Sequence, residues 1–168
     1  DLDAMYLGDS PPNFGQISFY DAARGECYRD FGDPIGVASR VLIQGLFGIL
    51  PDALNKQIIL RPGFPADWDK ASVSTPDISY RFTRKEDTDT YHITQRFQTP
   101  LHPVLQINAR KEKIRSVKVN GVPATWQSIE SAHGYPLLSI QAEGTSSTTI
   151  TIEWEGAPLH TLAAQEPV

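Results

Sequence analysis

Three neighbouring side chains just before residue 33 have the chemistry that sugar binding needs. Tyr28, Arg29 and Asp30 supply an aromatic ring, a guanidinium group and a carboxylate. A pyranose needs hydrogen-bond partners for its hydroxyls and an apolar surface for its ring, so this set fits such a ligand. The competing interpretation is that Asp30 is a solvated loop charge. We take the three residues as candidate substrate contacts.

Trp68 is the fourth candidate contact. In the pair Asp67-Trp68 the indole face can stack on the C–H groups of a sugar, but a tryptophan at a turn between two domains is more often buried between them, and we favour burial. Trp126 and Trp154 lie in predicted strands and are interpreted as core or sheet-surface residues. The remaining acidic candidates are Asp1, Asp3, Asp9 and Asp33, of which the last is also a predicted helix cap.

No complete catalytic motif accompanies these candidates. The single Cys27 excludes an internal disulfide and a cysteine-based zinc site. A Gly-x-Ser-x-Gly elbow is absent, although a Ser–His–Asp set scatters in sequence and stays open. We assign no catalytic residue and expect neither a metal nor a cofactor. Metal-ligand spacing is lacking for all four histidines, His92, His102, His133 and His160.

Charge and composition narrow the classes of partner. The 168 residues carry a net charge of −5, whereas a nucleic-acid-binding domain normally presents a basic face. The densest basic segment, residues 110–115, is short and is predicted to be a solvated turn between two strands. No apolar run reaches the length of about 18 residues that a transmembrane helix needs. We therefore expect neither nucleic acid nor a membrane as a partner.

A helix is predicted from residue 33 to about residue 49. Asp33 is a good N-cap and Pro34 suits the first helical position. Gly48 and Pro51 are expected to end the helix. Apolar residues cover most of its circumference, so we expect it to be buried and covered on several sides by other helices.

Residues 1–32 show neither helical nor strand periodicity but are rich in aromatic side chains. Such a composition is not that of a disordered segment, so we expect these rings to pack against a larger domain. The sequence begins at Asp1, without an initiator methionine or a signal peptide. We interpret the chain as a piece of a longer protein.

Beyond residue 56 the pattern changes to alternation with period two, which predicts short strands. A polar loop at residues 85–89 is predicted to close one hairpin, and Asn120-Gly121 another, because both residues tolerate positive φ. The last two strands are predicted to form a further hairpin. The spacing indicates an antiparallel β-sandwich. The predicted strands are residues 57–60, 71–74, 78–84, 90–98, 104–109, 114–119, 122–127, 136–142 and 148–155.

The segment around the predicted helix resembles a known family. Residues 40–52 (RVLIQGLFGILPD), 60–68 (LRPGFPADW) and 71–80 (ASVSTPDISY) are similar to the C-terminal part of bacterial glycoside hydrolases built on an (α/α)6 barrel. The α-L-rhamnosidase-like group and related uncharacterised polysaccharide-degradation proteins are the kind it resembles. The similarity extends from residue 33 to about residue 125, and to the last strands only by pattern.

The pattern and the resemblance together imply a mainly β fold, in which an antiparallel β-sandwich follows an irregular segment and one terminal α-helix of an (α/α)6-type barrel. Residues 1–52 are expected to end the helical domain, residues 53–162 to form the sandwich and residues 163–168 a tail. The resemblance implies a C-terminal fragment of a periplasmic or secreted carbohydrate-active enzyme. Its partners would be an upstream catalytic helical domain and a carbohydrate substrate. The catalytic carboxylates would come from barrel loops, so the fragment alone is expected to be inactive.

Two other functions stay open. A free-standing carbohydrate-binding module would use Trp68, Trp126 and Tyr135 as a platform. A structural or adhesion sandwich would bind no ligand. A binding module has no use for a helix that must be covered on several sides, so the predicted helix favours the enzyme fragment.

Overall fold

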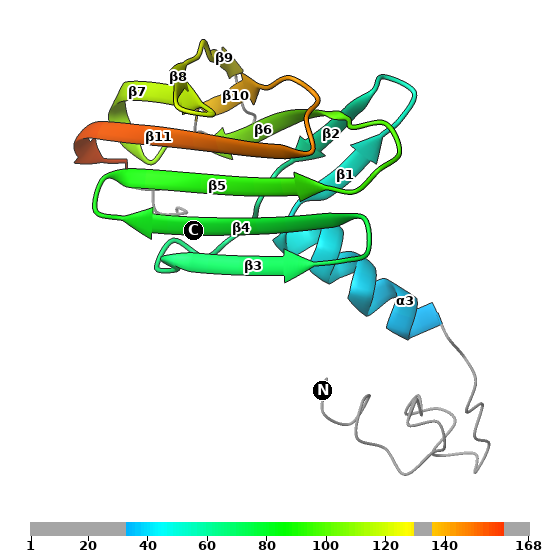
Figure 1. Cartoon of the computed structure of the whole chain (residues 1–168). Coiled ribbons are helices and arrows are strands. Elements are labelled where there is room, and N and C mark those ends of the chain that lie inside the picture. The colour runs from blue at the N-terminus through cyan, green and yellow to red at the C-terminus, as the bar shows by residue number, and fades with distance from the viewer. Residues whose placement is uncertain (1–32, 130–135, 160–168) are drawn as a thin grey trace, which may run out of the picture. The chain divides into compact units, whose positions relative to one another are not determined.

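A computed structural model describes residues 33–129 and 136–159 of the chain. The chain divides into two compact units, with the boundary between Gly45 and Leu46. In the described part, the first unit contributes a helical segment and the second contains the strands (Figure 1). The predicted irregular segment and the predicted tail lie outside the described residues, so those parts of the domain organisation stay predictions.

The helical segment is shorter than predicted. An α-helix, α3, runs over Asp33–Arg40 and a π-helical turn, η1, over Val41–Leu46, whereas Ile49–Asp52 forms strand β1. Gly48 separates the two kinds of structure, because its φ of +66° is a left-handed conformation that ends a helix. Ile49 is 3% exposed and pairs with β2, so burial in a sheet outweighs continuation of the helix. The predicted helix is therefore wrong over its last residues, and β1 belongs to the sandwich.

The helical segment is also more exposed than predicted. Val37 is 59%, Val41 62% and Leu42 47% exposed, and no residue of η1 is buried. Within the described residues, the predicted burial of this helix is therefore not found. None of the helices in the described ranges is long and apolar enough to cross a membrane.

The second unit is a β-sandwich of two sheets, as predicted (Figure 1). One sheet has five strands in the order β1-β2-β6-β10-β9, and the other has six in the order β3-β4-β5-β11-β7-β8. The pairings are antiparallel except that of β2 with β6, which is parallel. The remaining strands are β2 (Gln57–Leu60), β3 (Lys70–Ser74), β4 (Ile78–Lys85), β5 (Thr88–Gln95), β6 (His102–Asn108), β7 (Lys111–Val119), β8 (Val122–Pro123), β9 (Gln127–Ile129), β10 (Leu137–Gln141) and β11 (Ser147–Pro158).

Three local predictions are wrong although most predicted strands are present. The predicted last hairpin does not form, because β10 pairs with β6 and β9 whereas β11 pairs with β5 and β7. Residues 142–146 therefore cross from one sheet to the other. Only β8 pairs back on β7, and the chain then leaves to form β9 in the five-stranded sheet. The basic segment 110–115, predicted as a turn, is mostly strand β7.

Two tight turns determine the strand register. Asn120 and Gly121 have φ of 52° and 81°, the left-handed pair that the sequence predicts for this hairpin. The turn between β4 and β5 is shorter than the predicted loop, since only Glu86 and Asp87 separate the strands. Glu86 there adopts a φ of 52°.

The core lies between the two sheets and is built from alternate residues of each strand. In β5 the buried row is polar at both ends and apolar in the middle: Asp89, Tyr91, Ile93 and Gln95. The six-stranded sheet adds Ile150, Ile152 and Trp154 from β11, and the five-stranded sheet faces them with Ile58, Leu60, Leu105 and Ile140. Each of these seven side chains is at most 1% exposed, so one continuous apolar core holds the sheets together.

Candidate functional site

An aromatic cluster links the point where the chain enters the sandwich to strands β4 and β5. Phe64 lies at its centre, with its ring centroid 5.4 Å from that of Phe47 in an edge-on contact. On its other sides it stacks on Phe82 at 5.2 Å and on Trp68 at 6.1 Å. Such pairs contribute about 0.5–1.5 kcal/mol each beyond buried area. We call this set the joint cluster; its members are Phe47, Phe64, Trp68, Tyr80, Phe82 and Tyr91.

Trp68, the predicted sugar contact, is 39% exposed in this cluster. It lies in the loop between β2 and β3, and its indole stacks on Phe64 at an interplanar angle of 19°. Arg84 holds the loop, because its Nη1 donates to the carbonyl oxygen of Ala66 at 2.8 Å and to that of Trp68 at 3.4 Å. The expected burial is thus only partial within the described residues. Part of the indole surface therefore remains accessible.

Arg84 is itself held by a buried carboxylate. Asp89 is 1% exposed and lies opposite Arg84 in the β4–β5 pairing. Its Oδ1 accepts a hydrogen bond from Arg84 Nε at 2.8 Å, and its Oδ2 accepts one from Trp154 Nε1 at 3.0 Å. Arg110 Nε lies 3.5 Å from Oδ2, a distance at which charge attraction acts without a good hydrogen bond. Two guanidinium groups thus compensate one carboxylate that would otherwise be penalised by burial.

Burial also changes the acidity of two tyrosines in the joint cluster. It raises the pKa of Tyr80 well above the usual value, and the neighbouring Tyr91 adds to that shift. Burial first, and then the charge of Asp89, raises the pKa of Tyr91. The hydroxyl of Tyr80 is buried without a hydrogen-bond partner. The ring of Tyr80 therefore serves the fold through its apolar area rather than through a polar contact.

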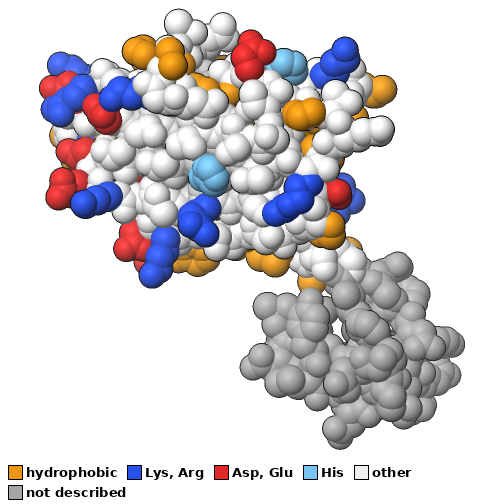
Figure 2. All heavy atoms as spheres, viewed as in Figure 1, with side chains coloured by type: hydrophobic (Ala, Val, Ile, Leu, Met, Phe, Trp, Pro, Cys, Tyr) orange, Lys and Arg blue, Asp and Glu red, His pale blue; other side chains and the backbone are white. Residues whose placement is uncertain are grey.

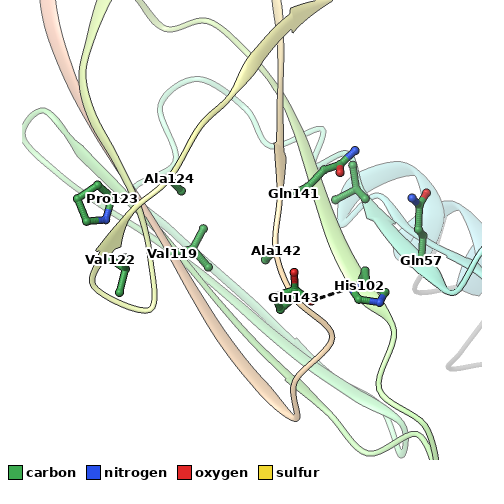
Figure 3. Close-up of a pocket in the computed structure, with 10 residues that line it drawn as sticks. Gln57, His102, Val119, Val122, Pro123, Ala124, Gln141, Ala142 and Glu143 are labelled. Atoms are coloured by element: carbon green, nitrogen blue, oxygen red, sulfur yellow. Dashed lines mark ion pairs between the residues drawn. The ribbon is translucent and has the colours of Figure 1, made fainter.

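A second feature is a cavity of about 320 Å³ at the end of the sandwich where the chain crosses between the sheets (Figure 3). Its polar lining comes from the five-stranded sheet and the crossover, and its apolar lining comes largely from β7, β8 and the residue that follows them. We call it the end pocket. The polar residues are Gln57, His102, Gln141 and Glu143, and the apolar ones are Val104, Val119, Val122, Pro123, Ala124 and Ala142.

The backbone determines the protonation of one ring nitrogen in the end pocket. The Gly144 N–H donates to His102 Nδ1 at 3.0 Å, so Nδ1 must carry a lone pair and the proton of the neutral ring lies on Nε2. Glu143 Oε2 lies 3.7 Å from the same Nδ1 (dashed in Figure 3). The same Nδ1 cannot accept from the Gly144 N–H and also donate to the Glu143 carboxylate. The shorter contact, made by the backbone, is the hydrogen bond. Glu143 therefore keeps its carboxylate available, with 92% of the side chain exposed.

The outer face of the six-stranded sheet has a different character. Figure 2 shows this face with few hydrophobic side chains and with basic groups scattered over it. Such a surface is typical of a sheet with one solvated face. Its strands alternate buried residues with polar ones, among them Ser79, Arg81, Thr83, Thr90, His92, Thr94, Thr149 and Thr151.

The structure describes only part of the predicted site. Asp33 is the first residue of α3, and Trp154 lies in the core as predicted. Within the described ranges, no group of three or more His, Cys, Asp or Glu residues could hold a metal ion. The predicted residues outside the described ranges are Tyr28, Arg29, Asp30, Asp1, Asp3, Asp9, Cys27, His133, His160 and Tyr135.

The two described tryptophans of the predicted platform do not form one surface. Trp68 precedes β3 and Trp126 follows β8, and these strands are the opposite edges of the six-stranded sheet. With strands about 4.8 Å apart, the two edges lie roughly 24 Å from each other. Trp126 is 42% exposed and lies outside any strand, contrary to its predicted place in one. Each indole would have to act alone.

Sequence reasoning missed the two buried polar residues that end the inner row of β5. Asp89 lies in the polar loop predicted over residues 85–89 and Gln95 in the strand predicted over residues 90–98, and neither was predicted to be buried. Gln95 is 4% exposed, and its amide bonds the Leu101 carbonyl oxygen at 2.7 Å and the Thr145 carbonyl oxygen at 3.1 Å. A signal was available, because both residues share the period of Tyr91 and Ile93.

Comparisons with known proteins identify similar structures of limited overlap. No family model matches the chain, and no curated protein matches it. The α-L-rhamnosidase from Dictyoglumus thermophilum has a TM-score of 0.48 and 16% identity over 71% of this chain. The Streptomyces avermitilis α-L-rhamnosidase complexed with L-rhamnose has a TM-score of 0.42 and 14% identity over 70% of this chain. The chain spans 14% and 11% of their lengths. Both similar structures are α-L-rhamnosidases, and both TM-scores lie below 0.5, so the likeness assigns no activity to this chain.

Replacing the buried carboxylate is expected to destabilise the sandwich strongly. In Asp89→Asn the side chain keeps its shape but loses its charge, so Arg84 and Arg110 lose their counter-ion. We expect the free energy of unfolding, measured by urea denaturation, to fall by about 3–5 kcal/mol. The matched control is Asp87→Asn, which removes an exposed carboxylate bound to Lys111 at 2.6 Å and should change stability little. Equal effects of the two variants would contradict this account of the network.

Removing the unpaired hydroxyl is expected to leave stability unchanged or to raise it by about 1 kcal/mol at neutral pH, since Tyr80→Phe removes a buried unsatisfied group. Because the folded pKa of Tyr80 is raised, its contribution to stability is complete below pH about 10 and is lost as the pH rises further. Each such tyrosine then lowers stability by about 1.4 kcal/mol per pH unit. In Tyr80→Phe the urea-denaturation midpoint should therefore fall less steeply with pH above about 10, by the contribution of one tyrosine. An unchanged slope would contradict the assignment.

Proposed function

We propose that this chain is the C-terminal part of a glycoside hydrolase, in which the β-sandwich braces a catalytic helical domain. The proposal is supported by the resemblance of residues 33 to about 125 to the C-terminal part of (α/α)6-barrel enzymes. It is supported physically by the helical segment that leads into the sandwich. In this proposal the substrate is a carbohydrate, the site of action is periplasmic or secreted, and the catalytic carboxylates lie in the helical domain.

The observation that carries the proposal is an apolar stripe without a cover among the described residues. Val37 and Val41 are spaced i,i+4 and therefore lie on one side of the helical segment, with Leu42 beside the second. Their exposures of 59%, 62% and 47% are high for aliphatic side chains. Burying a side chain of this kind contributes about 1.5–3 kcal/mol. A protein domain that covers the stripe would gain that free energy, and a helical domain offers matching ridges and grooves.

The sandwich supplies a firm attachment directly after this stripe. Phe47 is 6% exposed and enters the joint cluster. At Gly48 an added Cβ would lie 1.9 Å from the Arg61 carbonyl oxygen, so the chain passes here through a gap that only glycine fits. The Leu46 carbonyl oxygen accepts from Gly63 N–H at 2.9 Å, and that of Gly48 accepts from Arg61 N–H at 2.9 Å. The chain is therefore anchored to the sandwich at Leu46 and Gly48, directly after the helical segment, as a brace requires.

The proposal is tested by placing a charge on the stripe in the protein that the chain's own gene encodes. Val41→Asp should lower the stability of that whole protein by at least about 2 kcal/mol, because a carboxylate is then forced into an apolar interface. Glycosidase activity should fall with it. In the present chain alone the same change should leave the thermal unfolding of the sandwich unaltered, since Val41 is 62% exposed there.

The matched control is Leu54→Asp, which introduces the same charge at a residue that is 98% exposed. It should alter neither stability nor activity in either protein. A gene that encodes no helical region before this chain would overturn the proposal. So would a whole protein in which Val41→Asp is as harmless as Leu54→Asp.

A further inference from the structure

We propose that the end pocket binds a small, neutral, polyhydroxylated ligand, the size of a single sugar residue. The inference that the ligand is a sugar rests on the proposed function. The existence of the pocket follows from the geometry of the sandwich alone. Nothing in the bracing role requires such a site. It would give the sandwich a ligand-binding activity of its own.

The size and position of the end pocket suit one ring rather than a long chain. Its volume of about 320 Å³ lies at the lower end of the range of about 300–1,000 Å³ for small-molecule sites. It lies where both sheets end, so one wall belongs to each sheet (Figure 3). A ligand there would touch both sheets and stabilise their contact.

The polar wall offers both donors and acceptors, as sugar hydroxyls require. Gln57 lies opposite His102 in the parallel β2–β6 pairing, and Gln141 lies opposite Val104 in the β6–β10 pairing. The amides of Gln57 and Gln141 each offer an acceptor oxygen and two N–H donors. His102 adds an Nε2–H donor, because its Nδ1 is occupied by Gly144, and Glu143 adds an acceptor.

The apolar wall is built on a hydrogen-bonded turn and presents aliphatic surface to a ring. Val119 and Val122 flank the Asn120-Gly121 turn and pair with each other across it. The turn is held because Asn120 Oδ1 accepts from Thr149 N–H at 2.8 Å and Asn120 N–H donates to the Thr149 carbonyl oxygen at 2.8 Å. Val122 is 65% exposed, more than an aliphatic side chain in a closed wall would be. The C–H face of a sugar ring would cover it.

The charges of the end pocket select against anions. Among its ten lining residues Glu143 is the one carboxylate, and no lysine or arginine lies beside it. An anionic ligand would meet that carboxylate at the rim of the pocket, where 92% of the Glu143 side chain is exposed. The site therefore favours a neutral sugar over its uronic acid.

The test is a titration of the ¹⁵N-labelled full chain with L-rhamnose, D-glucose, D-galactose and D-glucuronate, followed by amide NMR. We expect saturable shifts at the pocket amides with at least one neutral sugar, and weaker binding of D-glucuronate than of D-glucose. Gln141→Ala and His102→Ala should each weaken binding by about three- to tenfold, the effect of one lost hydrogen bond. Gln141→Ala leaves the Gly144–His102 hydrogen bond intact, so it tests the ligand contact without disturbing the crossover.

Two matched controls should leave the affinity unchanged. Gln127→Ala removes an exposed glutamine of the same sheet, and His92→Ala removes an exposed histidine of the other sheet; neither lines the pocket. The absence of saturable shifts, or shifts confined to other residues such as Trp68, would overturn the inference. So would full affinity in both pocket variants. These outcomes leave the effect of Val41→Asp untouched, so the failure of this inference and that of the bracing function are distinguishable.

Discussion

The buried carboxylate of Asp89 is the interaction on which the rest of the sandwich depends. It binds Arg84 of β4 and Trp154 of β11, so one side chain joins three neighbouring strands of the six-stranded sheet. Arg84 extends the network to the backbone of the loop before β3. At the other end of β5, the side chain of Gln95 donates hydrogen bonds to the carbonyl oxygens of Leu101 and of Thr145, which lies in the crossover between the sheets. The core is thus closed by a polar residue at each end of one strand, and a polar network of this kind is stable only when its members are satisfied.

This arrangement holds the loop with Phe64 and Trp68 against the sandwich although the loop contains no regular structure. Its backbone is held by Arg84, and its rings pack between Phe47 and strand β4. Phe47 in turn follows the helical segment directly in sequence. The sandwich therefore has an aromatic cluster where the chain enters, and a small pocket at the end where the chain crosses between the sheets. These two places carry the bracing proposal and the ligand proposal separately.

The sequence predicted the class of fold well and the partners of individual strands less well. Period-two alternation located most strands, and Asn120-Gly121 marked its turn, because these signals are local. The last hairpin was wrong because alternation is the same in both sheets, so only tertiary packing decides that β10 and β11 separate. The helix was predicted too long because Ile49 is apolar in either structure, and its pairing in β1 comes from distant β2. Asp89 was missed since charged residues are rarely buried without partners, and its two arginines lie in strand β4 and just before strand β7.

The bracing account is tested most directly by amide hydrogen exchange over residues 36–46, measured in the whole protein that the gene encodes and in this chain alone. A covered stripe restricts local opening of the helical segment. The account predicts that these amides exchange at least about tenfold more slowly in the whole protein, while those of β5 and β11 exchange alike in both. Equal exchange of residues 36–46 in the two proteins would contradict it, because no domain would then be packed on the stripe.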